Sequence, residues 1–129
     1  LEWSGTRDIS AFLAVPDAIE FQHQLGWDEL RLRCHNLASM ARSSLEEITG
    51  LPVLYPDDTQ WYMQMGTVPL PEVIDAPEVQ ARLYREFRIE IPITHWRNRP
   101  LLRFSVQIYN DESDILALKK ALSVILCKA

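Results

Sequence analysis

One arginine in an alternating stretch is the residue whose type and setting most clearly suggest chemistry. Arg103 lies in the segment Leu101-Leu102-Arg103-Phe104-Ser105-Val106-Gln107-Ile108-Tyr109-Asn110. The period of two predicts a strand whose polar face carries Arg103, Ser105, Gln107 and Tyr109. A guanidinium on that face offers a planar fork of donors that can hold a carboxylate at two points. The alternative is an arginine on a solvated sheet face, followed by Asn110 as an ordinary helix cap.

A second stretch that could bind a ligand is Gly5-Thr6-Arg7-Asp8, which directly precedes a predicted helix. A glycine lets a ligand approach the backbone closely, and the Thr6 hydroxyl can donate to an anion near the free amides of the helix. The same residues also fit a plain capping segment, with Asp8 or Ser10 at the N-cap. The local sequence leaves both interpretations open.

Other kinds of catalytic site find little support in the chain. A metal site needs clustered ligands, whereas His23, His35 and His95 stand alone, and neighbouring side chains such as Cys34 and His35 point about 100° apart on a helix. No G-x-S-x-G elbow, P-loop or dinucleotide-binding glycine pattern is present. We therefore predict neither a metal ligand nor a catalytic residue in this chain, and we expect Cys34 to be buried as a small apolar side chain.

Four helices are predicted from apolar residues that recur every three or four positions. Proline is accepted in the first turn of a helix and glycine is typical just after its last turn, so these residues mark the boundaries. The predicted helices run from Asp8 to Leu25 with a break or restart at Pro16, from Asp28 to Thr49 with Gly50 as terminator, from Pro77 to Phe87, and from Asn110 or Asp111 towards the end.

Three strands are predicted from alternation and β-forming residues. They are Trp61 to Leu70, Ile89 to Thr94, and Leu101 to Tyr109, the last two forming a hairpin around His95 to Pro100. No repeat or interior linker interrupts the chain. We therefore expect residues 1–129 to form one α+β unit, a two-layer small domain with a short, mainly antiparallel sheet and helices packed on it.

The composition limits the partners and the compartment. The 129 residues carry 13 basic and 18 acidic side chains, a net charge of −5, so there is no basic excess to attract nucleic acid or an anionic membrane. No apolar run approaches the roughly 18 residues of a membrane span. Cys34 and Cys127 are too few for a disulfide scaffold. These features predict a soluble cytoplasmic protein with free thiols.

Taken together, the two polar stretches resemble a known family. Gly-Thr-Arg-Asp at 5–8, the helix that contains Pro16, and the Arg-x-Ser-x-x-x-Tyr-Asn pattern that begins at Arg103 are similar to the C-terminal part of class V aminotransferase-like enzymes, in the isopenicillin N epimerase-like branch. The similarity runs from about Trp3 to the end. It implies the small C-terminal domain of a fold-type I, pyridoxal phosphate-dependent homodimer, whose large cofactor-binding domain would lie upstream of this chain.

The resemblance also implies roles for two residues. The threonine that matches Thr6 reaches the phosphate of the cofactor bound in the partner subunit, and the arginine that matches Arg103 binds the α-carboxylate of the substrate. The turn His95 to Asn98 either lines the substrate pocket or is simply exposed. Lys119, Lys120 and Lys128 all lie on the closing helix, so none fits the Schiff-base lysine. We therefore expect this chain to be inactive by itself.

The implied reaction is epimerisation, transamination or carbon-sulfur lysis of an amino acid or an amino-acid-containing peptide. Cysteine desulfurases and carbon-sulfur lyases are an alternative, but the desulfurase interpretation is weakened because no cysteine lies between Cys34 and Arg103, where that group carries its nucleophile. A third alternative, from a different class, is a free-standing interaction module without an active site.

Overall fold

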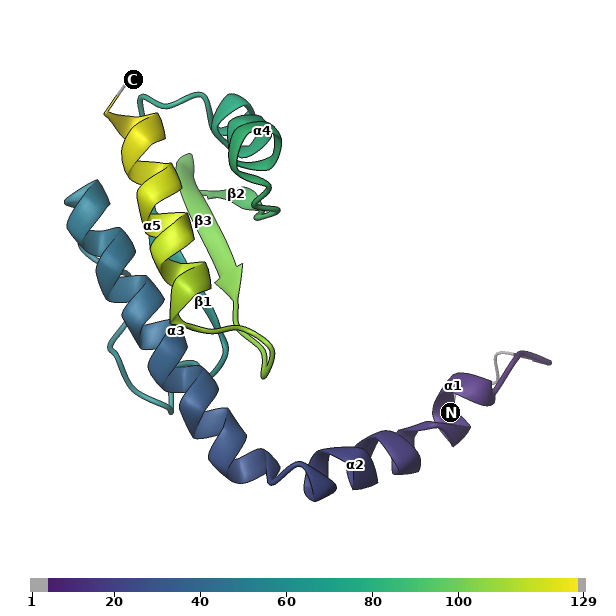
Figure 1. The fold of residues 1–129 in the computed structure, drawn as a ribbon. Helices are drawn as coiled ribbons and strands as arrows, with labels where there is room; N and C mark the ends of the chain where they lie inside the picture. Colours follow the sequence, from purple (N-terminus) through teal and green to yellow (C-terminus); the bar gives the residue numbers. More distant parts are fainter. Residues whose placement is uncertain (1–4, 128–129) are drawn as a thin grey trace. The chain divides into compact units, whose positions relative to one another are not determined.

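A computed structural model describes residues 5–127 of the chain, which divides into two units, residues 1–30 and 31–129 (Figure 1). None of the helices in residues 5–127 is both long enough and apolar enough to cross a bilayer. The elements are α1 (Ser10–Leu13), α2 (Val15–Gln24), α3 (Trp27–Thr49), β1 (Met65–Pro69), α4 (Ala76–Phe87), β2 (Ile93–Trp96), β3 (Arg99–Ser105) and α5 (Glu112–Leu126).

The first unit contains α1, α2 and the beginning of α3. Pro16 lies in the first turn of α2, which confirms the predicted restart. The predicted cap of α1 was wrong by one residue, because Ile9 occupies the N-cap position and has no capping side chain. Asp8 supplies the acceptor from one residue further out, since its carboxylate accepts the backbone N–H of Ser10 at 2.9 Å.

Helix α3 begins one residue earlier than predicted, so Asp28 lies in its first turn rather than at its N-cap. It ends at Thr49, as expected, because Gly50 adopts the left-handed conformation with φ 64°. The Gly50 N–H still closes the last turn on the Glu46 carbonyl at 2.8 Å. One face of the helix is buried, and Cys34 on that face is 2% exposed, as predicted.

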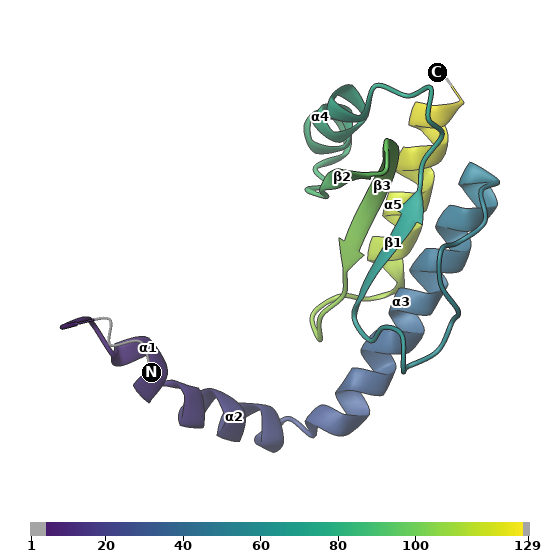
Figure 2. The same ribbon diagram turned by 180° about the vertical axis from the view of Figure 1, so that it is seen from behind.

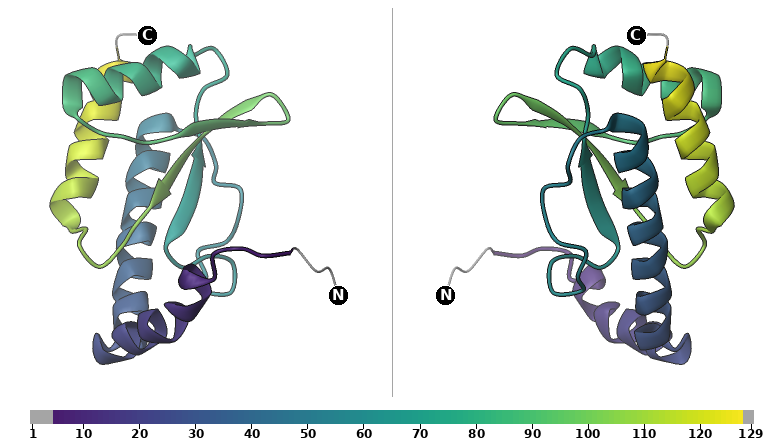
Figure 3. Two further views of the ribbon diagram at one scale, coloured as in Figure 1. Left: turned by 90° about the vertical axis from the view of Figure 1, so that its right-hand side faces the viewer. Right: turned by 90° about the vertical axis from the view of Figure 1, so that its left-hand side faces the viewer.

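The sheet is antiparallel, in the order β1-β3-β2 (Figures 2 and 3). Strand β3 is central: Arg103 lies opposite Thr67 of β1, and Leu102 lies opposite Ile93 of β2. Arg97 and Asn98 connect β2 to β3 with φ values of 48° and 64°, which a two-residue hairpin turn requires at both positions. The predicted hairpin and the α+β fold class are confirmed.

All three strands are shorter than the alternation predicted. Before β1, the backbone N–H groups of Trp61 and Tyr62 turn back to the Asp58 carbonyl at 2.9 and 3.2 Å. After β3, the Gln107 N–H donates to the side chain of Asn110 at 2.9 Å. In each case a local acceptor replaces a partner on the neighbouring strand. The alternation of apolar and polar residues in the sequence is therefore longer than the hydrogen-bonded strand.

Helices α3 and α5 lie on one face of the sheet, and α4 lies at one end, next to α5 and β2 (Figures 1 and 3). The inward side chains of β3, Leu102 and Phe104, are at most 5% exposed within this core. The opposite face, which carries Arg103, is not covered by any helix of the described second unit (Figure 2). Arg103 and Ser105 are therefore exposed on this face, whereas Leu101 on the same face is buried.

Gly66 is required by close packing inside the sheet. It lies opposite Phe104, and a Cβ atom at this position would lie 2.9 Å from both Phe104 Cε2 and the Tyr55 hydroxyl oxygen. We expect Gly66→Ala to lower the free energy of unfolding by about 1–3 kcal/mol, as overpacking does. Urea denaturation measures this, with Ser105→Ala on the open face as the control that changes little. Equal stability of wild type and Gly66→Ala would contradict the packing argument.

Candidate functional site

Arg103 lies in the middle of β3 with its side chain on the open face of the sheet. The side chain is exposed, and the backbone is held on both sides, by the pairing with Thr67 and by a hydrogen bond from its N–H to the Pro92 carbonyl at 3.0 Å. The guanidinium has no hydrogen-bond or ion-pair partner among residues 5–127. A rigid strand therefore presents five free donors to a ligand.

A groove of about 380 Å³ has Arg103 among its lining residues. It is lined by residues 103–106 of β3 and the following turn, by the segment 88–92, by Met65 of β1, and by the first half of α5. Strand β2 begins at Ile93, which pairs with Leu102. The part of β3 that follows Leu102 therefore has no β2 residue beside it, and the hollow lies at this edge of the sheet. The walls include the buried side chains of Ile91 and Phe104. The groove thus combines apolar walls with a free cation, as small-molecule sites do.

A larger hollow, of about 560 Å³, lies between α3 and the N-terminus of α5, where the side chains of Asp111 and Ser113 are already hydrogen-bonded to each other. Hydrogen bonds from Ser113, with a smaller contribution from Arg33, lower the pKa of Asp111. Asp111 and Asp114 also form a reciprocal capping box at the start of α5. Since carboxylates already occupy this helix terminus, the groove at Arg103 is the better site for an anion.

Asn110 was predicted as the cap of the last helix, but Asp111 occupies that position. Asn110 instead supports the capping box, because its side-chain amide donates to Asp114 Oδ2 at 3.0 Å. Its side-chain oxygen accepts from Gln107, which closes the turn between β3 and α5. Both Asn110 and Asp114 line the groove, with their polar groups engaged within the chain.

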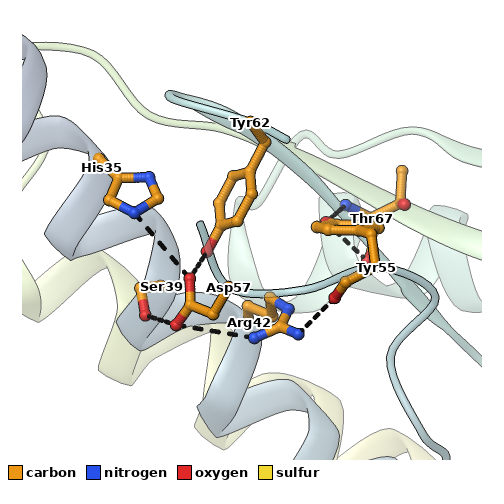
Figure 4. A network of polar contacts seen from close by, with 7 residues as sticks. All are labelled: His35, Ser39, Arg42, Tyr55, Asp57, Tyr62 and Thr67. Carbon is orange, nitrogen blue, oxygen red and sulfur yellow. Dashed lines mark hydrogen bonds and ion pairs between the residues drawn. The ribbon is translucent and has the colours of Figure 1, made fainter. Parts of the chain in front are cut away.

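A network of polar side chains joins α3 to the loop that connects α3 with β1 (Figure 4). Its centre is Asp57, whose carboxylate accepts hydrogen bonds from the hydroxyls of Ser39 and Tyr62. Arg42, which is 7% exposed, lies 3.7 Å from the same carboxylate, and His35 Nε2 lies 4.0 Å from it. Most of the network is therefore buried against α3 around one anion.

The pKa values of the network follow from these contacts. The hydrogen bonds from Ser39 and Tyr62 lower the pKa of Asp57, with further lowering from the charge of Arg42. Burial and the hydrogen bond to Asp57 raise the pKa of Tyr62. Asp57 is therefore ionised and Tyr62 neutral at physiological pH.

The network does not form a nucleophilic site, although it contains a serine, a histidine and an aspartate. A nucleophilic serine must donate its proton to the imidazole, whereas Ser39 donates to the carboxylate of Asp57 (Figure 4). His35 has no hydrogen bond with Ser39; its Nε2 lies 4.0 Å from Asp57 Oδ1, and its ring packs against Tyr62 with the centroids 4.8 Å apart. We interpret the network as structural.

Tyr55 connects this network to the strand opposite Arg103. Its carbonyl accepts from Arg42 Nη2 at 2.7 Å, while its hydroxyl accepts the Thr67 N–H at 2.7 Å and donates to the Thr67 carbonyl at 3.1 Å (Figure 4). Thr67 therefore has both outward backbone groups satisfied at the free edge of β1. A continuous set of contacts thus runs from α3 to the pair Thr67 and Arg103.

Thr6, the second predicted site residue, belongs to the first unit and is exposed. Gly5 before it has φ 74°, and α1 after it has only four residues. The first amide of that helix is already occupied by Asp8, and the exposed Thr6 hydroxyl is one of the donors that remain at this place. Thr6 and Arg103 belong to separate units of the structure.

The remaining candidates among residues 5–127 do not line the groove. Residues 95–98 are exposed, but His95 and Trp96 belong to β2 rather than to the turn, and none of the four lines the groove at Arg103. Lys119 on α5 is ion-paired with Glu47 at 2.7 Å, and Lys120 is exposed on the same helix. Lys128 lies outside the described residues. Among residues 5–127, no cluster of ligands suits a metal ion.

Sequence reasoning missed Arg88, which shares the groove with Arg103. It lies at the C-cap of α4 with φ 59°, a left-handed position where glycine is usual. The signal was present, because the predicted helix ends at Phe87 with neither glycine nor asparagine after it. Only the fold, however, places this residue beside Arg103.

Comparisons with known proteins add an independent result. No family model matches the chain. It is 37% identical over 125 residues to an isopenicillin N epimerase of Streptomyces clavuligerus, and 30% identical over 138 residues to a probable L-cysteine desulfhydrase of Arabidopsis thaliana. These alignments cover 97% and 94% of this chain, which spans only 31% and 28% of the length of those two relatives.

The fold itself also has a counterpart of known structure. An alanine-glyoxylate aminotransferase from Nostoc sp. superposes with a TM-score of 0.69 over 97% of this chain and 33% of the aminotransferase, at 22% identity. That similarity concerns the fold. It agrees with the sequence comparison in matching this chain to about one third of a longer protein.

Proposed function

Because this chain is related over nearly its whole length to isopenicillin N epimerase, among the class V aminotransferase-like proteins, we propose that it is the small C-terminal domain of a pyridoxal phosphate-dependent enzyme. The enzyme acts on an amino acid or an amino-acid-containing peptide. The chain spans about one third of its relatives, so the activity belongs to the complete protein. By itself, the chain is inactive.

The observation that carries this proposal is the free guanidinium of Arg103 in the groove. A substrate carboxylate needs a partner that fixes its position and its orientation, and a bidentate guanidinium does both. The open face of β3 gives the side chain access, while the paired backbone keeps its origin rigid. Arg103 therefore binds and orients the carboxylate of the substrate and takes no part in proton transfer.

Among the described residues, we assign only Thr6 to contact with the cofactor. Pyridoxal phosphate acts as an electron sink when bound, and it needs a lysine and a set of phosphate donors. The ion pair with Glu47 and the place on α5 make Lys119 unsuitable, and Lys120 shares that helix. The exposed hydroxyl of Thr6 suits a phosphate oxygen. We therefore assign Thr6 to the cofactor phosphate and the lysine to another part of the complete protein.

The expected assembly is a cytoplasmic homodimer in which Thr6 reaches the cofactor phosphate held by the partner subunit. The epimerase relative favours epimerisation as the reaction. A second candidate is carbon-sulfur lysis, which the similarity to a cysteine desulfhydrase supports. Both reactions begin with the same requirement, an amino acid whose carboxylate is held in place.

The role of Thr6 can be tested in the complete protein. Thr6→Ala should weaken cofactor affinity by roughly tenfold to a hundredfold, because one hydrogen bond to a charged group contributes about 1.5–3 kcal/mol. Equilibrium dialysis with pyridoxal phosphate measures this, and Thr6→Ser, which keeps the hydroxyl, serves as the matched control. Unchanged affinity in Thr6→Ala would refute the assignment.

A further inference from the structure

Strand β1 has one edge that no strand covers, and a single side chain closes it opposite Arg103. In the sheet order β1-β3-β2, β1 pairs on one side only. On the open side, the Tyr55 hydroxyl accepts the Thr67 N–H at 2.7 Å and donates to the Thr67 carbonyl at 3.1 Å (Figure 4). For Thr67, Tyr55 therefore does what a neighbouring strand would do.

This contact occurs at one position of the edge. Backbone groups alternate along a strand, so those of Met65 and Pro69 face the same open side as those of Thr67. Proline has no N–H to donate, and the Met65 N–H has no side-chain acceptor among residues 5–127. Tyr55 thus fixes the edge of β1 opposite Arg103 rather than elsewhere along the strand.

The glycine before Thr67 makes room for this contact. A Cβ atom at Gly66 would lie 2.9 Å from the Tyr55 hydroxyl oxygen and would also meet the Phe104 ring. The backbone itself does not require glycine here, because Gly66 is not among the residues with positive φ. The close approach of the Tyr55 hydroxyl to β1 is therefore a reason for glycine at this position.

Tyr55 is itself held firmly on the side of α3. Its carbonyl accepts from Arg42 Nη2 at 2.7 Å, and the Arg42 guanidinium lies 5.5 Å above its ring. Its ring also meets the Tyr62 ring edge to face, with the centroids 5.3 Å apart. Since Arg42 is only 7% exposed, Tyr55 connects β1 to a buried and well-fixed part of the fold.

The strand position that Tyr55 fixes is the direct neighbour of Arg103. Both backbone groups of Thr67 face Tyr55, so its pair with Arg103 is of the kind without hydrogen bonds, in which opposite side chains are closest. Both side chains project from the same face. Threonine is branched at Cβ and keeps few rotamers, so it is a stiff neighbour for the flexible stem of an arginine.

We propose that Tyr55 is a positioning residue for the substrate carboxylate: it holds Thr67 in place, and Thr67 limits the directions in which the Arg103 guanidinium can point. The proposal rests on the function proposed above. A bidentate contact requires both planar groups to be aligned. An arginine without a fixed neighbour still attracts a carboxylate by charge but aligns with it less well.

The test compares the binding of L-alanine and L-alaninamide to the complete protein with pyridoxal phosphate bound, by isothermal titration calorimetry. The amide keeps the shape of the amino acid and lacks the carboxylate. Tyr55→Phe removes only the hydroxyl, and we expect it to lower the preference for the acid over the amide about threefold to tenfold, the scale of one hydrogen bond. Amide binding should stay within about twofold. An unchanged preference would overturn the proposal.

The matched control is Tyr62→Phe, which removes a hydroxyl from the same network without touching β1, because Tyr62 donates to Asp57. Thermal unfolding should show a loss of stability in both variants, whereas the preference for the acid should remain within about twofold of wild type in Tyr62→Phe. If Tyr62→Phe lowers the preference as much as Tyr55→Phe does, the effect is one of general stability and the positioning role is refuted.

Two further variants test the route through Thr67. Thr67→Val keeps the branched shape and should preserve the preference for the acid. Thr67→Ala removes the stiff neighbour and should lower the preference by about the same factor as Tyr55→Phe, and the two changes combined should lower it no further. A normal preference in Thr67→Ala would contradict the route from Tyr55 to Arg103.

Arg103→Gln distinguishes this proposal from the function on which it rests. It should abolish the preference for the acid. If it does so while Tyr55→Phe keeps the preference, only the positioning role is refuted. If Arg103→Gln has no effect, or if the wild type binds the acid and the amide equally, the proposed function loses its site and the role of Tyr55 falls with it.

Discussion

Replacing Arg103 with alanine should lower kcat/KM of the complete enzyme for its amino-acid substrate by roughly thirtyfold to several thousandfold. This range corresponds to the ~2–5 kcal/mol lost when one partner of a charged, desolvated pair is removed. The effect should be large because Arg103 is a free cation in the groove, on a strand held from both sides. Steady-state kinetics with the amino acid that proves to be the substrate measures it.

The conservative variant sharpens this prediction. Arg103→Lys should lower kcat/KM by roughly tenfold or more, because lysine keeps the charge and loses the planar fork. Arg85→Lys, on α4 and outside the groove, is the matched control and should remain near wild type. The melting temperature should change little in all three variants, since these side chains are exposed. Unfolding of Arg103→Ala would show that the residue is structural, whereas unchanged turnover would show that the substrate carboxylate is held elsewhere.

Replacing Asp57 with alanine should cause the largest loss of stability among the variants considered. The change leaves Arg42 buried without its counter-ion and removes the acceptor of both Ser39 and Tyr62. Breaking a buried pair costs about 3–5 kcal/mol, but the Asp57 side chain is 37% exposed, so solvent reduces the expected loss to about 2–3 kcal/mol. Urea denaturation measures this loss. Glu72→Ala is the control, because its 3.7 Å ion pair with Arg99 is exposed on both sides.

The contribution of Asp57 should also depend on pH. Hydrogen bonds from Ser39 and Tyr62 lower its pKa in the folded protein, so the folded state binds this proton more weakly than the unfolded state does. The stabilisation is complete above the ordinary value of 3.8 and is lost as pH falls through the lowered folded pKa. The stability difference between wild type and Asp57→Asn should therefore narrow in that acidic range. A constant difference down to acid unfolding would contradict the network.

Local patterns predicted the elements well where a single segment carries its own signal. Pro16 marked the restart between α1 and α2, Gly50 the end of α3, and the alternation around Arg103 the central strand. These signals are local because backbone conformation depends on the residue itself and on its immediate neighbours. The α+β class followed from the order of those elements.

Strand ends were less predictable from the same patterns. Alternation continues through residues 106–109, but β3 stops at Ser105 because the Gln107 N–H finds Asn110. Likewise, before β1, the backbone N–H groups of Trp61 and Tyr62 donate to the Asp58 carbonyl and form a turn instead of extending the strand. Whether a strand continues depends on the presence of a neighbouring strand, and that neighbour is distant in sequence.

The sequence by itself determined which face of β3 carries Arg103, because side chains alternate along any strand whatever it pairs with. Only the tertiary structure decided that the segment 88–92 and α5 form a groove around this arginine, that Arg88 lies in it, and that Tyr55 holds the opposite strand through Thr67. These are contacts between elements that lie tens of residues apart in the chain. They arise when apolar faces pack together, and no local spacing encodes which polar side chains that packing brings side by side.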